Sequence, residues 1–281
     1  MTPGAEVPAD GPERKVSPFT PVGLVEPHAR MLKAPALDQK LYKIMSLANF
    51  ERSLTGQYLH FTRIDKFQGD PGDGAQPPKD RAANVIPKFE KAPDFSASDY
   101  YDKARTRTYA LCLSQAATRY HWKTYGRGEP AVCVVFDFAK LRNLLNETIQ
   151  QRGALIYDGI ACEQIFSINY GVVEYVDAAS HHVNVEHLRA PEAYAFIKDK
   201  RFAPDQEVRI TLSAFGLGDF ALNDGSYLPF RDYLQLGFSF HHAIKTGIIH
   251  GLLTPPEADE GPLRDVLERV RIKPAESASP G

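Results

Sequence analysis

A carboxylate and a guanidinium stand two positions apart in Glu207 and Arg209, within a run of β-forming residues that ends at Leu212. Successive side chains of a strand point to opposite faces of a sheet, so these two side chains share one face. There they can form an ion pair or bind a shared ligand, and a weak pair on an exposed strand face is the non-functional alternative. We take Glu207 and Arg209 as candidate catalytic residues.

Three further segments place polar or aromatic side chains near the ends of expected strands. Trp122 is the only tryptophan, and with Tyr125 it could stack on a base or a nicotinamide ring, although an aromatic plug in the core fits the same spacing. Asp70 lies among turn-forming residues, which is typical of an ordinary tight loop. These segments add one catalytic candidate, Thr62, and five ligand-binding candidates: Tyr42, Lys43, Asp70, Trp122 and Tyr125.

The order of these segments along the chain resembles that of a bacterial family catalogued only as a domain of unknown function. The pattern of that family is Leu-Tyr-Lys, then Phe-Ser with a nearby Phe-x-Asp-Pro, then Trp-x-x-Tyr after a Cys-Phe-Ser strand, and finally Glu-x-Arg. The likeness spans residues 41–212, with Thr62 in place of the usual serine and Gly69 in place of the usual asparagine. It implies a fold and the location of a site, and no particular reaction. The counterparts in this chain are Leu41-Tyr42-Lys43, Phe61-Thr62, Phe67 with Asp70-Pro71, Leu111-Cys112-Leu113-Ser114, Trp122 with Tyr125, and Glu207-Val208-Arg209.

A looser likeness in layout connects the same residues with ADP-ribosyltransferases. In that layout a glutamate on a late strand binds the ribose hydroxyl and stabilises the positive charge that develops on the sugar as nicotinamide leaves. Glu207 would take this role, and Thr62 would supply the hydroxyl on the second strand. Tyr42 or Lys43 would take the first-strand position, where those enzymes usually have Arg or His. The likeness implies NAD as the substrate of a transferase or glycohydrolase.

Two other function classes use the same residues differently. In a metal-dependent nuclease, Asp70 or Asp73 would hold a divalent cation together with Glu207. Arg209 would then lie near the scissile phosphate, where it could stabilise charge but could not act as a base, because arginine stays protonated. The remaining class is a non-catalytic module that binds a small molecule or a protein. The histidines show no spacing typical of a metal site, so we predict no metal.

One arrangement would distinguish an enzyme from a binding module. An enzyme should gather four of the candidates around one concave pocket, whereas a binding module need only expose an apolar patch. The four candidates are Tyr42, Thr62, Trp122 and Glu207.

The composition bears on partners and on the cellular compartment. Lys plus Arg (33) nearly balances Asp plus Glu (35), so the overall charge favours neither nucleic acid nor an anionic membrane. No apolar run reaches the ~20 residues of a membrane span. The cysteines, Cys112, Cys133 and Cys162, are odd in number and lie apart in the chain, which favours free thiols in a reducing compartment over disulfides. We therefore expect a cytoplasmic protein, and its oligomeric state stays open.

The two ends of the chain differ from its middle. Residues 1–35 hold seven of the 21 prolines and lack apolar periodicity, which predicts a disordered, extended tail. Within residues 256–281, apolar residues recur at helical spacing between Leu263 and Val270, which predicts one short helix before a disordered end. A single domain should therefore occupy residues 36–255.

The elements of that domain must position the candidates. Their order lacks a strict βαβ alternation, which favours an α+β fold with a mixed or mostly antiparallel central sheet and short flanking helices. Ser46 and Asp137 are expected to begin helices as N-caps. We predict strands over residues 41–45, 58–62, 109–114, 131–136, 170–176, 207–212 and 244–249, and helices over residues 47–54, 138–149 and 191–197.

Overall fold

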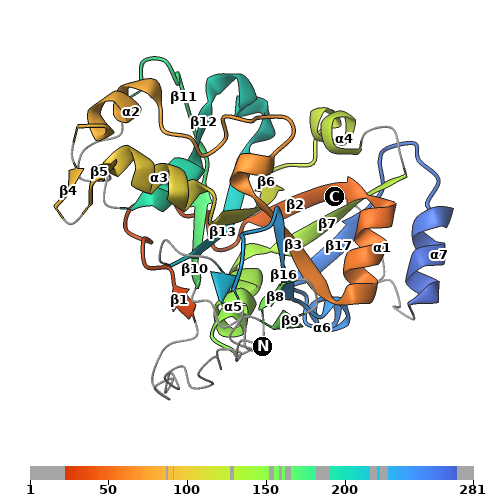
Figure 1. The fold of residues 1–281 in the computed structure, drawn as a ribbon. Helices are drawn as coiled ribbons and strands as arrows, with labels where there is room; N and C mark the ends of the chain where they lie inside the picture. The colour runs from red at the N-terminus through yellow and green to blue at the C-terminus, as the bar shows by residue number, and fades with distance from the viewer. Residues whose placement is uncertain are drawn as a thin grey trace, which may run out of the picture.

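A computed structural model describes residues 23–86, 88–90, 92–126, 130–151, 155–157, 160–161, 166–181, 190–215, 220–221 and 227–270. It shows an α+β fold in which an open, mostly antiparallel sheet forms the centre and short helices pack against it (Figure 1). The predicted fold class, including the single domain, is confirmed. No helix within the described ranges has both the length and the apolar character that crossing a membrane requires.

The central sheet contains eleven strands within the described residues. Every neighbouring pair runs antiparallel except β1 and β10, which pair in parallel. The order along the main path is β1, β10, β13, β6, β3, β16, β8 and β9, while β2, β7 and β17 branch from β6. The strands are β1 (Gly23–Val25), β2 (Lys40–Ser46), β3 (Tyr58–Arg63), β6 (Thr108–Ser114), β7 (Ala131–Asp137), β8 (Leu155–Tyr157), β9 (Ile160–Ala161), β10 (Phe166–Val172), β13 (Glu207–Ala214), β16 (Tyr233–Gly237) and β17 (Ile249–Leu253).

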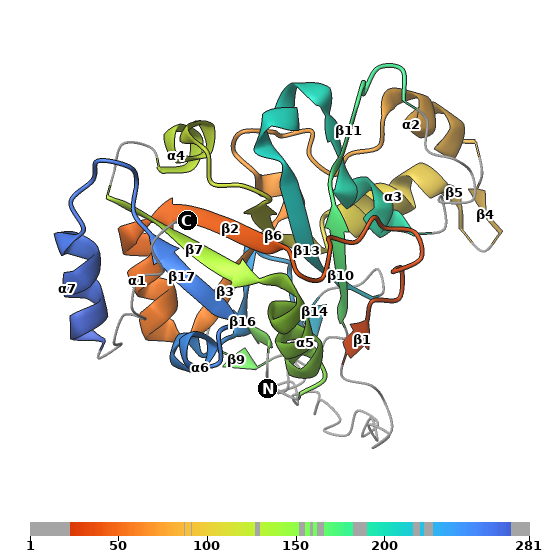
Figure 2. The same cartoon turned by 180° about the vertical axis from the view of Figure 1, so that it is seen from behind.

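Strand β6 is the junction of this sheet (Figure 2). Along one edge it pairs with β13 over its whole length, up to Ser114 opposite Glu207. Along its other edge it pairs with β3 near its beginning, where Ala110 lies opposite Thr62, and with β2 at its end, where Ser114 lies opposite Tyr42. The sheet therefore forks at β6, and one branch begins with β3 while the other begins with β2.

Helices cover both faces of the sheet. The main hydrophobic core lies under α1, α5, α6 and α7, which all contribute apolar side chains to it. On the opposite face lie α4 and the 3₁₀ helix η3, each over a smaller apolar cluster. The helices are α1 (Leu47–Gly56), α2 (Pro78–Asn84), α3 (Ala97–Arg105), α4 (Arg119–Gly126), α5 (Phe138–Ile149), α6 (Phe240–Lys245), α7 (Gly261–Arg269), η1 (Ile64–Lys66), η3 (Pro191–Phe196) and η4 (Lys200–Asp205). Three small two-stranded sheets pair β4 (Lys88–Phe89) with β5 (Ala92–Ser96), β11 (Glu174–Val176) with β12 (Ile197–Asp199), and β14 (Phe220–Ala221) with β15 (Tyr227–Leu228).

Two predicted N-caps begin the helices that follow β2 and β7. The Ser46 hydroxyl accepts a hydrogen bond from the Asn49 amide, and the Asp137 carboxylate accepts one from the Lys140 amide. Each bond satisfies an amide that has no partner within its helix, which is typically worth about 1 kcal/mol. Helix α1 ends where Gln57 takes the left-handed conformation. Both caps are confirmed.

Strand β13 shows how the sheet sorts apolar from polar side chains. Val208, Ile210 and Leu212 face the main core and are fully buried, which stabilises the fold by roughly 1.5–3 kcal/mol for each side chain. Alternation places Glu207 and Arg209 on the opposite face, as predicted. That face is buried as well, so its polar groups need partners within the protein.

The prediction of a strand over residues 244–249 is wrong. Helix α6 occupies the beginning of this range, and β17 starts only at Ile249. Ser239 caps the helix, and its residues Phe240 and Ala243 face the core. A short apolar run fits a buried helical turn as well as a strand, and here the cap decides in favour of the helix.

Three other boundaries differ from the prediction. The strand expected to begin at Tyr170 begins at Phe166, and the helix expected over 191–197 is the 3₁₀ helix η3. Residues 23–35, which we assigned to the N-terminal tail, include β1, and the carbonyl of Lys33 accepts a hydrogen bond from the Val172 amide at 2.7 Å. The predicted tails of residues 1–22 and 271–281 lie outside the described residues, as does Cys162.

Candidate functional site

Glu207 and Arg209 form the centre of a buried network of charges. Arg209 is fully buried, and its guanidinium holds the Asp73 carboxylate in a bidentate pair at 2.6 and 2.5 Å. It also donates to the Glu207 carboxylate at 2.7 and 3.2 Å and to the Ala195 carbonyl at 2.6 Å. These five hydrogen bonds use all five N–H donors of an arginine side chain. No donor of Arg209 is left for a ligand.

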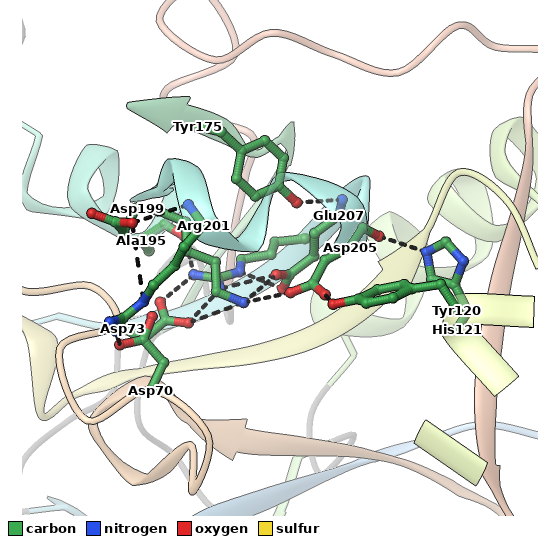
Figure 3. A network of polar contacts seen from close by, with 12 residues as sticks. Asp70, Asp73, Tyr120, His121, Tyr175, Ala195, Asp199, Arg201, Asp205 and Glu207 are labelled. Carbon is green, nitrogen blue, oxygen red and sulfur yellow. Dashed lines mark hydrogen bonds and ion pairs between the residues drawn. The ribbon is translucent and has the colours of Figure 1, made fainter. Parts of the chain in front are cut away.

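A second cation, Lys198, completes the neutralisation of Glu207. Its ammonium group lies 3.1 Å from the Glu207 carboxylate and 3.0 Å from the Asp205 carboxylate. Tyr120 of α4 donates its hydroxyl to Asp205 at 2.9 Å, and the Tyr175 hydroxyl accepts from the Glu207 amide at 2.7 Å. Figure 3 shows the carboxylates of Asp73, Asp205 and Glu207 gathered at the centre of this network. We call the five charged residues Asp73, Asp205, Glu207, Lys198 and Arg209 the buried charge network.

The network fixes the ionisation of its carboxylates. Burial acts to raise the pKa of Glu207, but the positive charges of Arg209 and Lys198 outweigh it and lower that pKa to about 2. Burial raises the pKa of Asp73, and the charge of Arg209 opposes that rise without cancelling it. Glu207 is therefore ionised at neutral pH and is held between two cations.

A separate cleft of about 850 Å³ opens where the sheet forks between β2 and β3. It is lined by residues of the strands β2, β3, β6, β7 and β16 and of the helices α1, α4 and α6. The described residues that line it include lysine, arginine, histidine and several aromatic rings, and none of them is Asp or Glu. They are Lys43, Ile44, Met45, Ser46, Ala48, Asn49, Arg52, Ser53, Tyr58, Leu59, His60, Thr62, Phe67, Ala110, Leu111, Cys112, Tyr125, Gly126, Val134, Phe136, Tyr233, Gln235 and Phe240.

Lys43 occupies the fork itself. The register of the sheet pairs Cys112 with Arg209 on β13, but with no residue of β2 or β3 on the other edge. The ammonium group of Lys43 donates to the Cys112 carbonyl at 2.9 Å. A side chain thus supplies the hydrogen bond that a neighbouring strand would have supplied, and its charge stands in the cleft.

Cys112 and Phe67 separate the cleft from the buried charge network. Both line the cleft. The Cys112 thiol hydrogen-bonds with the Glu207 carboxylate, and the Phe67 ring lies 5.7 Å from the Arg209 guanidinium. Burial, together with the negative charge of Glu207, raises the pKa of the Cys112 thiol, so the thiol stays protonated. The Glu207 carboxylate therefore lies one side chain behind the cleft wall.

One family model matches part of the chain, from within α4 to the first half of β13. Residues 121–210 match the family described as protein of unknown function (DUF2971). This match confirms the resemblance to a family of unknown function. No curated protein and no solved structure matches the chain. The DUF2971 segment contains Lys198, Asp205, Glu207 and Arg209 of the buried charge network, whereas β2, β3 and α1 of the cleft lie outside it.

The structure divides the predicted site residues among several environments. Thr62, Lys43 and Tyr125 line the cleft. Tyr42 and Trp122 pack instead against the small apolar cluster under α4, which is the aromatic plug that the spacing also fitted. Of the four candidates expected to converge in an enzyme, Thr62 alone is among the described residues that line the cleft.

Asp70 belongs to neither the cleft lining nor the centre of the network. Its carboxylate accepts a hydrogen bond from the Gly72 amide at 3.1 Å and lies 3.9 Å from the exposed guanidinium of Arg201. This is the turn that its sequence predicts. The neighbouring Asp73 is the residue that reaches Arg209.

Sequence reasoning missed several residues of both sites. Within the DUF2971 segment, Lys198 lies in the short strand β12 and Asp205 ends the 3₁₀ helix η4, and both elements are too short for a periodic pattern to mark these residues. Arg52 and His60 of the cleft also went unnoticed. His60 lies two positions before Thr62 on β3, and this spacing could have placed both side chains on one face.

Proposed function

We propose that this protein binds a small organic ligand in the cleft between β2 and β3, and that NAD is the first ligand to test. The observation that carries the proposal is the opening of the sheet at β6. A volume of about 850 Å³ is within the usual range of ligand pockets. Because neighbouring strands diverge around it, the cleft belongs to the architecture of the sheet and does not depend on one surface loop.

The rings in the cleft suit a ligand that carries an aromatic group. The rings of His60 and Tyr233 stack on each other with their centroids 5.1 Å apart. Tyr233 and Tyr125 are 38% and 36% exposed, so each offers ring surface to a ligand. Stacking on such rings is favourable for any planar heterocycle. Adenine and nicotinamide both meet this requirement.

A second candidate function is NAD turnover, as in an ADP-ribosyltransferase or glycohydrolase. The position of Glu207 supports it, because this carboxylate lies directly behind Cys112 at the cleft wall. The contacts of Glu207 argue against turnover, because its carboxylate already accepts hydrogen bonds from Arg209 and Lys198. A ribose could reach the carboxylate only after the wall had moved. Binding without turnover is therefore our first proposal, and turnover is the second.

The metal-dependent nuclease hypothesis has less support. Asp73 and Glu207 already neutralise Arg209 and Lys198, and Asp70 closes a turn. Across the part of the chain that the structure describes, no group of His, Cys, Asp or Glu is arranged to hold a metal ion. Protein binding remains an alternative within the non-catalytic class. The free thiols Cys112 and Cys133 support our proposal of a cytoplasmic location.

Titration calorimetry of the protein with NAD tests the binding proposal. Ala48 lines the cleft from α1, and Ala83 is an exposed alanine of α2 outside the cleft lining. Ala48→Trp should abolish binding by filling the cleft, and Ala83→Trp should leave it unchanged. Binding that survives Ala48→Trp would place the ligand elsewhere. No binding of NAD or of any member of a nucleotide and nucleoside panel would refute the proposal.

Release of nicotinamide tests the second candidate. The wild-type protein is incubated with NAD and candidate acceptors, and free nicotinamide is measured. Release that Ala48→Trp abolishes would establish turnover in the cleft and would put the enzyme first. Binding without release would leave the non-catalytic module as the function.

A further inference from the structure

We infer that the ligand carries a phosphate or diphosphate group, and that Lys43, Arg52 and His60 form the end of the cleft that binds it. This inference rests on the proposed ligand binding in the cleft. It goes further by naming the chemical class of the ligand and its orientation.

The three basic groups come from three different elements. Lys43 lies on β2, Arg52 on α1 and His60 on β3, and all three line the cleft. Burial lowers the pKa of His60, and the positive charges of Lys43 and Arg52 lower it further. The charges therefore act on one another, as charges that converge on one end of a cavity do.

The charges of Lys43 and Arg52 lack the carboxylate partners that the cations of the buried charge network have. Lys43 donates to a carbonyl, and Arg52 donates to the side-chain carbonyl of Asn49. The structure shows no carboxylate bonded to either cation within the described residues, and those that line the cleft include no Asp or Glu. In the buried charge network, by contrast, each cation meets carboxylates directly.

Like charges gathered in a concave site repel one another and focus a positive potential into it. A bound anion relieves this repulsion, so binding energy should depend on the charge of the ligand. A neutral ligand would leave the positive charges of Lys43 and Arg52 without a counter-charge. The electrostatics thus favour an anion over a neutral ring.

The arrangement favours phosphate over a single carboxylate. A carboxylate has two oxygens, which one arginine fork can satisfy. Three donors on three elements suit a group whose charge is spread over more oxygens, and Arg and Lys both bind phosphate. His60 stacks on Tyr233, which places ring surface next to the anion site. A ring beside a phosphate is the chemistry of a nucleotide.

The test compares ligands that share the adenosine group and differ in their phosphates, ADP-ribose carrying a second ribose as well. Calorimetry measures adenosine, AMP and ADP-ribose against the wild-type protein at low and high salt. We expect AMP and ADP-ribose to bind at least about tenfold more tightly than adenosine, with the difference shrinking as salt rises. Arg52→Met should remove most of this difference and leave adenosine binding unchanged. Arg264→Met, which removes an exposed arginine of α7, is the matched control and should change nothing.

The outcomes distinguish failure of the phosphate site from failure of ligand binding in the cleft. If adenosine binds as tightly as AMP, and Arg52→Met weakens neither, the phosphate site is refuted while ligand binding in the cleft stands. If none of the three ligands binds, and NAD does not bind either, both the phosphate site and nucleotide binding in the cleft are refuted. Lys43→Met provides an independent check, since it should reduce AMP affinity without reducing adenosine affinity, provided that thermal unfolding shows the variant folded.

Discussion

Replacing Glu207 by glutamine tests whether this carboxylate holds the fold together. Glutamine has the same shape but no charge, so Arg209 would be left with Asp73 as its one direct carboxylate and Lys198 with Asp205. The new amide group would also present donors to two cations that need acceptors. Breaking one partner of a buried ion pair typically costs about 3–5 kcal/mol.

The pKa of Glu207 gives a consistent magnitude. Its fall from the ordinary value of 4.5 to about 2 corresponds to about 3 kcal/mol of stabilisation at neutral pH. Because the pKa is lower in the folded protein, this stabilisation is complete above pH 4.5 and is lost as the pH falls toward 2. A chain of this size should lose about 10 °C in its unfolding midpoint at pH 7.

Chemical denaturation of wild-type and Glu207→Gln protein at pH 7 and at pH 3 measures the effect. The difference in unfolding free energy should be about 3 kcal/mol at pH 7. It should be about half of that at pH 3, where Glu207 is protonated in the unfolded wild-type chain and must release its proton on folding. Asp177→Asn is the control, because Asp177 forms an exposed pair with Lys200 and should change stability by less than about 0.5 kcal/mol. A Glu207→Gln protein as stable as the wild type at pH 7 would refute the reasoning. A difference that is the same at both pH values would show that charge is not its cause.

Three further outcomes are expected. In denaturation experiments Gly74→Ala should lose about 1–3 kcal/mol of stability, because Gly74 has a φ of +67° and a Cβ there would collide with Ile64. Gly69→Ala is the control, because the new methyl group has open space around it. Cys133, whose pKa burial raises to about 12, should react with a thiol reagent only after unfolding, and fast labelling of the native protein at this residue would contradict its burial. Burial and, to a smaller extent, the positive charges of Lys43 and Arg52 lower the pKa of His60 in the free protein. NAD should raise this pKa in an NMR titration, because the diphosphate opposes the positive charges, and NAD affinity should accordingly increase as the pH falls. An unchanged His60 pKa in the complex would contradict contact with the phosphate.

The local part of the structure followed from the sequence. The caps at Ser46 and Asp137, the strand at Glu207 and the shared face of Glu207 and Arg209 depend on residues a few positions apart, and all were predicted. The strand predicted over residues 244–249 failed because a short apolar run has no distinctive period.

The two sites could not be predicted in the same way. Arg209 meets Asp73, which lies 136 residues earlier in the chain, and no local pattern brings these two together. The cleft depends on which strands flank β6 and on where each of them stops pairing. This pairing depends on the whole sheet, so no local sequence pattern predicts that Arg52 and His60 line the same cleft.

The fork at β6 also determines which pieces of this chain can exist alone. The segment of residues 121–210 contains β7 and β10, but the partners of β7 are β2 and β17, and one partner of β10 is β1. A fragment cut to these limits would expose unpaired strand edges, which readily add strands from other chains. We therefore expect such a fragment to aggregate when it is expressed. The unit that folds must extend far enough on both sides to close these edges.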